Sequence, residues 1–258
     1  MSIKIGPAGL GSVKTALKQL EEYHRLGFKA CEIAFTYSVY IKNEKDAKEI
    51  GKKAKELGIS LSIHAPYFVN LNSEDKEKRE ASKKRILSCC EVGDWLGAKG
   101  VVFHPGYYGK DRNGAYDNIR DEIKDMLVII KKRGWSVELY PETMGKINVF
   151  GSIEEIAGLM KDTGCGACID FAHILARDKK VDYVKVKNLF KNEKWHCHFS
   201  GIVYGDKGEK NHKTTEKKEW QELFENLPSG KEIVIINESP TMFDDCLEGI
   251  KIAEKFNL

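Results

Sequence analysis

AKGVVFHPG (98–106), GAYDNIRDEIKDMLVIIKKRG (114–134) and WSVELYPE (135–142) follow one another along the chain. The first and third segments are short, continuous apolar runs of strand length, whereas the middle one has apolar residues at helical spacing and ends in glycine. Continuous apolar runs are typical of strands that are covered on both faces. The three segments therefore predict a unit in which a helix connects two parallel strands.

The same alternation extends in both directions along the sequence. We expect strands at 2–9, 28–35, 59–67, 98–106, 135–142, 166–173, 194–201 and 231–238. We expect helices at 13–27, 43–58, 73–97, 114–134, 152–164, 214–228 and 242–257, and partly helical structure at 174–192. Eight such units predict an α/β fold, a single (β/α)8 TIM-barrel domain over 1–258 with its active site at the carboxyl-terminal ends of the strands. A doubly wound open sheet of eight strands is the alternative.

The chain of 258 residues carries 42 basic and 39 acidic side chains, a formal net charge of +3. This balance excludes a strongly basic protein that binds nucleic acid through bulk charge, but not one with a local basic patch. The number of cysteines is odd, and no signal peptide or membrane-spanning run is visible. We therefore expect a cytoplasmic protein with free thiols and no membrane partner. We also expect a monomer. Cys165 and Cys168 form a lone CxxC pair, and we expect no structural zinc site there.

Imidazole and carboxylate side chains recur where the predicted strands end. They are His64, His104, Glu142, Asp170, His173, His198 and Glu238, and His212 follows in the loop after the seventh strand. Taken singly, each has an ordinary structural explanation, such as a hydrogen-bonded loop histidine or a helix N-cap. Because a barrel gathers its strand ends at one mouth, we expect all eight to converge there. His196 lies one layer deeper than His198 on the same strand face, so we expect His198 to be the ligand and His196 to support it.

Eight donors are too many for one zinc ion, which takes about four. A set of this size with a bridging carboxylate suits two or three ions, and such clusters stabilise the attacking and leaving oxygens of a phosphoryl displacement. The absence of thiolates among the eight side chains favours Zn²⁺ or Mn²⁺.

Several short motifs resemble the endonuclease IV family, which lies within the xylose-isomerase-like TIM barrels. They are IHAPYFVNL (63–71), FHPG (103–106), PETMGK (141–146), CIDFAH (168–173), HFSG (198–201), GEKNH (208–212) and NESP (237–240). The resemblance implies a DNA-repair enzyme of base excision, a metal-dependent apurinic/apyrimidinic endonuclease. Such an enzyme hydrolyses the phosphodiester 5′ to an abasic site in duplex DNA by attack of a metal-bound hydroxide, and its zinc site is trinuclear.

The resemblance also implies a role for each residue. His64 and His104 match ligands of a first ion, Glu142 matches a carboxylate that bridges to the second, and Asp170, His198 and Glu238 match the remaining ligands of the second. His173 and His212 match ligands of a third ion, Glu142 and Glu238 match the catalytic carboxylates, and Tyr67 matches an aromatic residue that the family inserts into DNA near the lesion.

One position departs from the family pattern. The third ion of the family usually has an aspartate two residues before the loop histidine, and here that position is Lys210, with Glu209 beside it. Either Glu209 supplies the carboxylate through a shift of one residue, or the third site is weaker or empty and Lys210 contacts a DNA phosphate. Lys207 and Lys213 would extend such a phosphate patch.

Two other functions fit parts of the pattern. A single-metal sugar isomerase or epimerase on the same barrel would use Glu142, Asp170, His198 and Glu238 alone, and its carboxylates would move protons beside a carbonyl. That function leaves four of the strand-end and loop histidines without a metal role. A binding protein that has lost catalysis is indicated only by Lys210. The joint presence of all eight donors favours the endonuclease.

Overall fold

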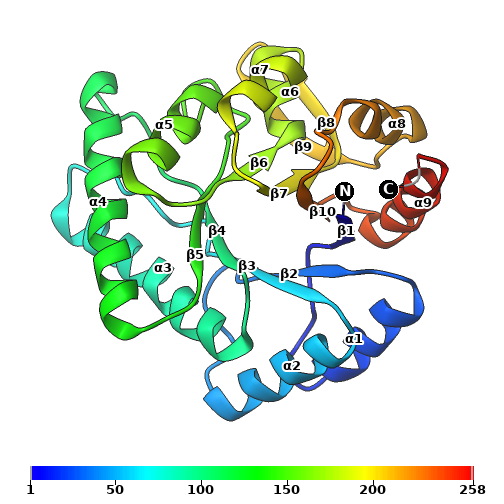
Figure 1. The fold of residues 1–258 in the computed structure, drawn as a ribbon. Helices are drawn as coiled ribbons and strands as arrows, with labels where there is room; N and C mark the ends of the chain where they lie inside the picture. Colours follow the sequence, from blue (N-terminus) through cyan, green and yellow to red (C-terminus); the bar gives the residue numbers. More distant parts are fainter. Residues whose placement is uncertain (1, 257) are drawn as a thin grey trace.

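In the computed structural model, which describes residues 2–256 and 258, eight parallel strands surround a central axis and helices cover their outside (Figure 1). The strands are β1 (Ser2–Pro7), β2 (Ala30–Ala34), β3 (Ser60–His64), β4 (Gly100–Phe103), β5 (Glu138–Pro141), β6 (Cys168–Asp170), β7 (Lys194–Phe199) and β10 (Glu232–Asn237). The helices are α1 (Ala16–Arg25), α2 (Glu44–Glu56), α3 (Lys76–Leu96), α4 (Arg112–Arg133), α5 (Ile153–Thr163), α6 (Phe171–Asp178), α7 (Tyr183–Leu189), α8 (Lys217–Asn226) and α9 (Met242–Lys255).

The strands close into a complete barrel. β2, β3, β4 and β5 pair in sequence order, and β6, β7, β10 and β1 form the other half. Two contacts join the halves, because the amide of Gly9 donates to the carbonyl of Glu32 over 2.7 Å and the amide of Thr143 donates to that of Cys168 over 3.1 Å. Gly6 allows the first junction, since a Cβ there would lie 1.7 Å from the carbonyl oxygen of Ala30. The TIM-barrel prediction is confirmed, and the open-sheet alternative is wrong because the first strand pairs with the last.

The helices begin and end where capping residues stand. The side chain of Asp111 accepts hydrogen bonds from the first turn of α4, and Ser152 forms a reciprocal capping box with Glu155 at α5. Gly134 and Gly164 end these two helices in the left-handed conformation, as their glycine stops predicted. The predicted last helix extends to 257, a residue that lies outside the described part of the chain.

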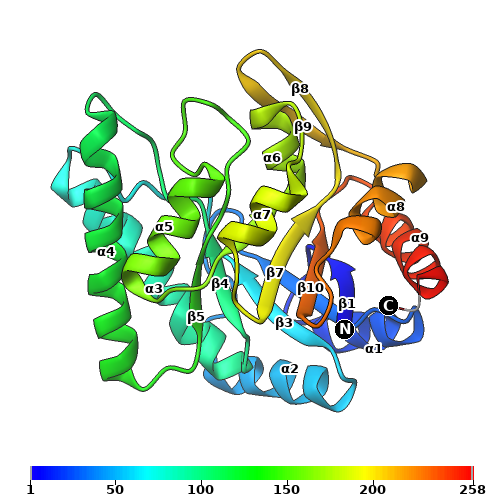
Figure 2. The ribbon, with the colours of Figure 1, turned by 45° about the horizontal axis from the view of Figure 1, so that its top comes forward.

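Two predicted elements differ from the structure near the barrel mouth. The strand expected at 166–173 ends at Asp170, because this carboxylate accepts a hydrogen bond from the amide of His173 over 2.7 Å and so caps α6. The segment expected to be a loop after the seventh strand forms an antiparallel hairpin of β8 (Gly201–Gly205) and β9 (Gly208–Lys213). Figure 2 shows this hairpin rising above the end of β7. Both differences bring extra side chains over the mouth.

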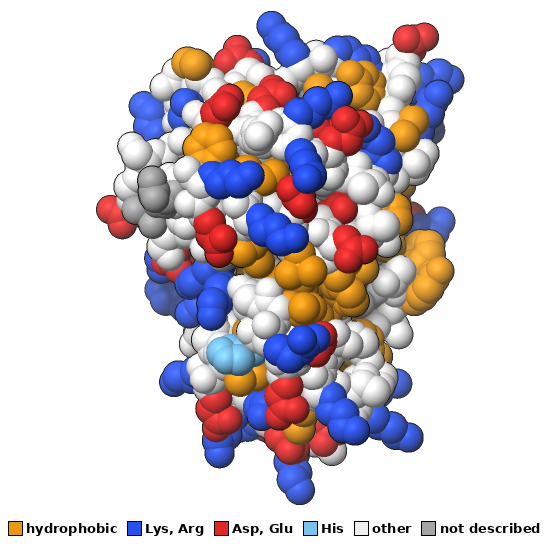
Figure 3. Space-filling model, turned by 90° about the vertical axis from the view of Figure 1, so that its right-hand side faces the viewer, with side chains coloured by type: hydrophobic (Ala, Val, Ile, Leu, Met, Phe, Trp, Pro, Cys, Tyr) orange, Lys and Arg blue, Asp and Glu red, His pale blue; other side chains and the backbone are white. Residues whose placement is uncertain are grey.

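The outer surface carries both signs of charge. On the face in Figure 3, basic and acidic side chains alternate around a small apolar area, with no field of one sign. This fits the balance of 42 basic against 39 acidic residues. Among the described residues, no helix is long and apolar enough to span a membrane.

Candidate metal centre

The eight imidazole and carboxylate side chains predicted from the sequence lie at the carboxyl-terminal end of the barrel. They fall into three groups whose donor atoms lie within 4.8 Å of one another inside each group. The first group is His64, His104 and Glu142, the second is Glu142, Asp170, His198 and Glu238, and the third is His173, Glu209 and His212. Glu142 belongs to two groups, and each predicted donor belongs to at least one.

Glu142 joins the groups because its two carboxylate oxygens face different histidines. It follows β5 directly and is completely buried. Its Oε2 lies 3.3 Å from Nε2 of His64 and 3.1 Å from Nε2 of His104. Its Oε1 lies 3.2 Å from Nδ1 of His198 and 3.2 Å from Nδ1 of His173. This is the arrangement that a carboxylate needs in order to bridge two ions.

The second group contains more acceptors than the protein satisfies. The group has three carboxylates but one imidazole, that of His198, whose Nδ1 lies 3.2 Å from Oε2 of Glu238. Histidines of the other two groups also face Glu142 and Asp170. Among the described residues, no lysine or arginine pairs with these carboxylates. Oδ2 of Asp170 is buried and accepts no hydrogen bond, although Nδ1 of His173 lies 3.2 Å away. Burial, together with nearby Glu142 and Glu238, raises the pKa of Asp170. The orphaned oxygen and the excess of acceptors fit a divalent cation.

The third group depends on an irregularity in the hairpin. His212 pairs with Ile202 and Asn211 with Val203, but Tyr204 pairs with Glu209, so Lys210 has no residue opposite it. This β-bulge reverses the side on which the preceding residue points. Glu209 therefore takes the inward position, with Oε2 3.5 Å from Nε2 of His173. Of the two possibilities that the sequence left open, the geometry favours Glu209 over an incomplete site.

Lys210 lies on the exposed side of the bulge. Lys213, which we considered for the same phosphate patch, instead pairs with Glu216 over 3.0 Å. Lys207 lies at the exposed hairpin turn. On this hairpin, Lys207 and Lys210 are therefore the lysines that could contact a phosphate, and Lys213 is not.

Replacing Glu209 with glutamine is expected to lower the affinity of the third group for zinc by more than about 10- to 100-fold, the range seen when a group that only supports a ligand is lost, because Glu209 is itself one of the three donors. The groups centred on Glu142 are expected to keep their ions, because Glu209 belongs to neither of them. Equilibrium dialysis against buffered zinc measures the change as loss of one ion per chain. Lys210→Ala is the matched control next in sequence, and loss of an ion in that variant alone would contradict the assignment.

Tyr67, the one aromatic residue predicted to contact DNA, lies beside the first group. Its ring centroid is 5.4 Å from that of His64 and 5.5 Å from that of His104, and the residue is 50% exposed. Three further aromatic residues that the sequence did not single out are also exposed nearby: Tyr37, Phe68 and Tyr107. We call these four residues the aromatic rim. A cleft of about 320 Å³ between Tyr67, Phe68 and Tyr107 is also lined by Lys78 and Arg85.

Glu32 was not predicted, although it is buried directly beneath the second group. It lies on β2, is 0% exposed, and its Oε1 is 2.9 Å from Nε2 of His198. Its Oε2 accepts hydrogen bonds from Oγ of Ser62 over 2.8 Å and from Nε2 of His196 over 3.0 Å. The sequence signal that could have found it is a lone carboxylate inside the apolar run ACEIA.

The structure also separates the roles of the two histidines on β7. His198 belongs to the second group, whereas His196 contacts Glu32 one layer below. His196 and His198 do form another possible donor set with Cys168. Burial raises the pKa of Cys168 well above its usual value, which opposes loss of the thiol proton. The structure places His198 in the second group and His196 one layer below it, and the assignment of His198 as the ligand stays a prediction.

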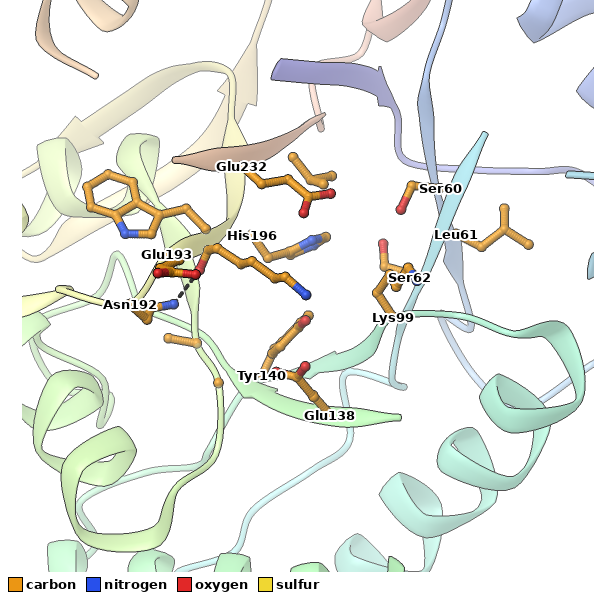
Figure 4. Close-up of a pocket in the computed structure, with 15 residues that line it drawn as sticks. Ser60, Leu61, Ser62, Lys99, Glu138, Tyr140, Asn192, Glu193, His196 and Glu232 are labelled. Carbon is orange, nitrogen blue, oxygen red and sulfur yellow. Dashed lines mark hydrogen bonds between the residues drawn. The ribbon is translucent and has the colours of Figure 1, made fainter. Parts of the chain in front are cut away.

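A separate cavity of about 360 Å³ opens at the opposite, amino-terminal end of the barrel (Figure 4). Ser62, Tyr140 and His196 form its inner wall, and charged residues such as Lys99 and Glu138 stand at its exposed rim. None of the grouped donors at the barrel mouth lines it. The layer that contains Glu32 therefore lies between this cavity and the metal centre.

The charges of the centre are strongly coupled. Burial opposes ionisation of Glu142, but His198 and His104 hold its pKa well below the usual range. Burial also opposes the charged form of His64, yet Glu142 raises the pKa of this imidazole to about 9. In the same way, the pKa of Glu238 falls to about 2 through His198. At neutral pH the protein alone thus pairs carboxylates with protonated imidazoles.

Zinc binding is expected to release protons at pH 7 and to become tighter as the pH rises toward about 9, because a metal binds only neutral imidazole and the pKa of His64 is about 9. For the metal-free chain the raised pKa has the opposite consequence. It stabilises the fold fully below the ordinary value of 6.5, and this contribution is lost as the pH rises through about 9. Calorimetric zinc titrations in buffers of different ionisation enthalpy measure the released protons, and a heat independent of the buffer would contradict the prediction.

Comparison with known proteins places this geometry in context. The model of a family described as xylose isomerase-like TIM barrel matches residues 20–241. An uncharacterized protein of Methanocaldococcus jannaschii is 37% identical over 223 residues, which are 80% of each chain. A probable endonuclease 4 of Mycoplasmoides gallisepticum is 29% identical over 138 residues, 52% of this chain and 45% of that protein. The chain thus spans about half the length of the endonuclease relatives that it matches.

Solved structures share the fold over the whole chain. Endonuclease IV from Thermus thermophilus superposes with a TM-score of 0.72 at 19% identity, covering 98% of this chain and 99% of that one. A D-tagatose 3-epimerase-like protein superposes with a TM-score of 0.73 at 20% identity, covering 98% and 97%. At these identities the likeness shows the fold alone, so the activity has to be argued from the site.

Proposed function

Because the chain belongs to the xylose isomerase-like TIM barrel family, in which one barrel serves several chemistries, we propose its activity from the arrangement of the metal centre. The proposed activity is that of a metal-dependent endonuclease, which hydrolyses the phosphodiester 5′ to an abasic site in duplex DNA. The observation that carries the proposal is the joining of three donor groups at one barrel mouth, with Glu142 shared between two of them. A single-metal enzyme has no use for most of these donors.

The residues present fit two or three divalent ions, zinc or manganese. His64, His104 and Glu142 would hold the first, and Glu142, Asp170, His198 and Glu238 the second. His173, Glu209 and His212 would hold the third. When bound, such ions neutralise charge on a phosphodiester and lower the pKa of water beside it.

Two carboxylates would act on the reacting groups. Glu142 orients its neighbours because each of its oxygens faces two imidazoles. Glu238 is the more accessible carboxylate, with 17% of its side chain exposed. His198 lowers the pKa of Glu238 to about 2 against the effect of burial, so this side chain is ionised at neutral pH. Glu238 therefore accepts a hydrogen bond from an attacking water and aligns it with the phosphorus.

The aromatic rim supports DNA as the substrate. Exposed aromatic side chains supply stacking surfaces for unpaired bases, and this contact does not depend on base sequence. Lys78 and Arg85 beside the rim, and Lys210 on the hairpin, are cations within reach of the mouth for phosphates. The mixed surface charge and the net charge of +3 argue against binding through bulk charge. The enzyme would instead recognise the damaged site because base stacking is weak there, so that the DNA is easily bent and the nucleotide easily turned out of the helix.

A sugar epimerase remains the second candidate, and one observation favours it. Glu142, Asp170, His198 and Glu238 form a complete four-donor group by themselves, and the fold is shared with a D-tagatose 3-epimerase-like protein. This function leaves the first and third groups unexplained. It predicts one ion per chain, whereas the endonuclease predicts two or three.

The test is cleavage of a labelled duplex with one abasic site by the zinc-loaded chain. We expect one cut on the 5′ side of the lesion, no cut in the undamaged duplex of the same sequence, and loss of the reaction with a chelator. Restoration by added zinc or manganese separates metal dependence from irreversible damage. An abasic duplex that stays intact with a folded chain of measured metal content would overturn the proposal.

A further inference from the structure

We infer that Glu32 is a positioning residue, which fixes the orientation and tautomer of His198 so that Nδ1 of this imidazole is available to the second group. The inference rests on the proposed metal chemistry of that group. Glu32 itself is not among the grouped donors. It lies inside the barrel, beneath the second group, where its side chain is 0% exposed.

The two oxygens of Glu32 have separate partners. Oε2 accepts from Oγ of Ser62 over 2.8 Å and from Nε2 of His196 over 3.0 Å. Oε1 accepts from neither and lies 2.9 Å from Nε2 of His198. Two donors on one oxygen hold the carboxylate in place, so the other oxygen is directed at His198.

The support below Glu32 is rigid. The ring of Tyr140 stacks on that of His196, with centroids 5.2 Å apart and planes 24° from parallel. Tyr140 itself lies between two glycines, since a Cβ at Gly100 or Gly166 would come within 2.2 Å or 2.4 Å of its ring. Figure 4 shows Tyr140 and His196 from the side of the amino-terminal cavity. The stack fixes the plane of His196, and through it the position of Glu32.

The tautomer of His198 follows from what each ring nitrogen faces. A neutral imidazole has one N–H and one lone pair. Without a metal, Nδ1 of His198 hydrogen-bonds Oε1 of Glu142 over 3.2 Å, whereas Nε2 lies 2.9 Å from Oε1 of Glu32 without a hydrogen bond. With a metal bound, the proton would stay on Nε2, toward Glu32, and the lone pair on Nδ1 would point to the space that Glu142 and Glu238 border at 3.2 Å. Without an acceptor below, the proton would be drawn to Nδ1 by those same two carboxylates and would block a metal there. A carboxylate behind a ligating histidine is the usual means of fixing this choice.

Hydrogen bonding supports the same role. Oε2 of Glu32 accepts from both Ser62 and His196, and such bonds favour the ionised carboxylate. The angle between Nε2 of His198 and Oε1 lies outside the hydrogen-bond range although the distance is short.

Glu32→Gln tests the inference, because it keeps the size of the side chain and replaces one acceptor oxygen with a donor. We expect zinc affinity of the second group to fall by about 10- to 100-fold while the first and third groups keep theirs. Visible absorption of the cobalt-substituted chain gives a separate readout, in which the bands of one ion change and the others stay. Glu32→Asp is expected to restore part of the affinity, since it restores both acceptors.

Ser62→Ala is a graded test of the same support. It removes one of the two donors from Oε2 but leaves both imidazole contacts, so zinc affinity of the second group is expected to fall by less than in Glu32→Gln. Long-range ¹H–¹⁵N correlation spectra of the zinc-loaded wild-type chain provide a test that needs no variant. We expect the proton of His198 on Nε2, and a proton on Nδ1 would overturn the inference even if Glu32→Gln failed to fold.

The outcomes separate this inference from the proposed function. If the wild-type chain binds two or three ions and Glu32→Gln binds them equally well, Glu32 has no positioning role and the proposed function stands. A folded wild-type chain that binds no divalent metal would overturn both.

Discussion

Glu142→Gln is expected to lower cleavage of an abasic duplex by roughly a hundred- to a thousandfold in kcat/KM, the scale of losing one group that stabilises the transition state. The reason is position, since this one carboxylate lies within 3.3 Å of four imidazoles and belongs to two donor groups. Glutamine keeps the volume but leaves the protonated imidazoles without a counter-charge and removes the bridge. Steady-state cleavage at saturating zinc measures the effect.

Glu138→Gln is the matched control for this variant. Glu138 lies on the same strand, β5, but is exposed at the rim of the cavity at the opposite end of the barrel. We expect cleavage by this variant to equal that of the wild type. Near-normal cleavage by a folded Glu142→Gln chain would remove the bridging carboxylate from the mechanism. DNA affinity measured separately should change little in either variant, because neither side chain belongs to the aromatic rim.

Removal of the metal is expected to lower the midpoint of thermal unfolding by roughly 10 °C for each tightly bound ion. A ligand at a thousandfold excess over its dissociation constant stabilises the fold by about 4 kcal/mol. In a chain of this size, each kcal/mol corresponds to roughly 2–4 °C. A bound cation would satisfy the buried oxygen of Asp170 that accepts no hydrogen bond, and the excess of carboxylates beside it.

Calorimetric scans of the zinc-loaded and chelator-treated chain measure this difference, and elemental analysis of the loaded chain gives the number of ions. Two or three ions with a large shift support the endonuclease, whereas a single ion supports the epimerase. Equal unfolding midpoints with and without chelator, at zinc concentrations that saturate any site, would show that these donors hold no structural metal. Readdition of zinc after dialysis is the control for irreversible unfolding.

The sequence predicted the barrel and most of the candidate site because both follow from local patterns. Strands and helices are recorded in the spacing of apolar residues within a few turns of chain, and capping residues mark their ends. His64, His104, Glu142 and Glu238 could be placed at the mouth from one further rule, that parallel strands in a barrel end on the same side. That rule required no knowledge of which strands are neighbours.

Only the tertiary structure decided the features that depend on pairing between distant segments. Glu209, and not Lys210, points to the third group because a bulge between β8 and β9 changes the register. Cross-strand hydrogen bonds decide which of these two neighbouring residues faces inward. His173 came to the site through a helix that Asp170 caps, and not through an extended strand.

Glu32 shows the limit most clearly. In the sequence it is one acidic residue in an apolar strand, and its partners Ser62 and His198 are 30 and 166 positions away. Closure of β1 onto β10 and onto β2 brings Glu32 and Ser62 together in the interior layer directly beneath His198. The sequence by itself therefore determined which residues stand at the strand ends. The closed barrel decided which of them touch and which buried group supports them, because contacts across its interior join segments that have no local relation.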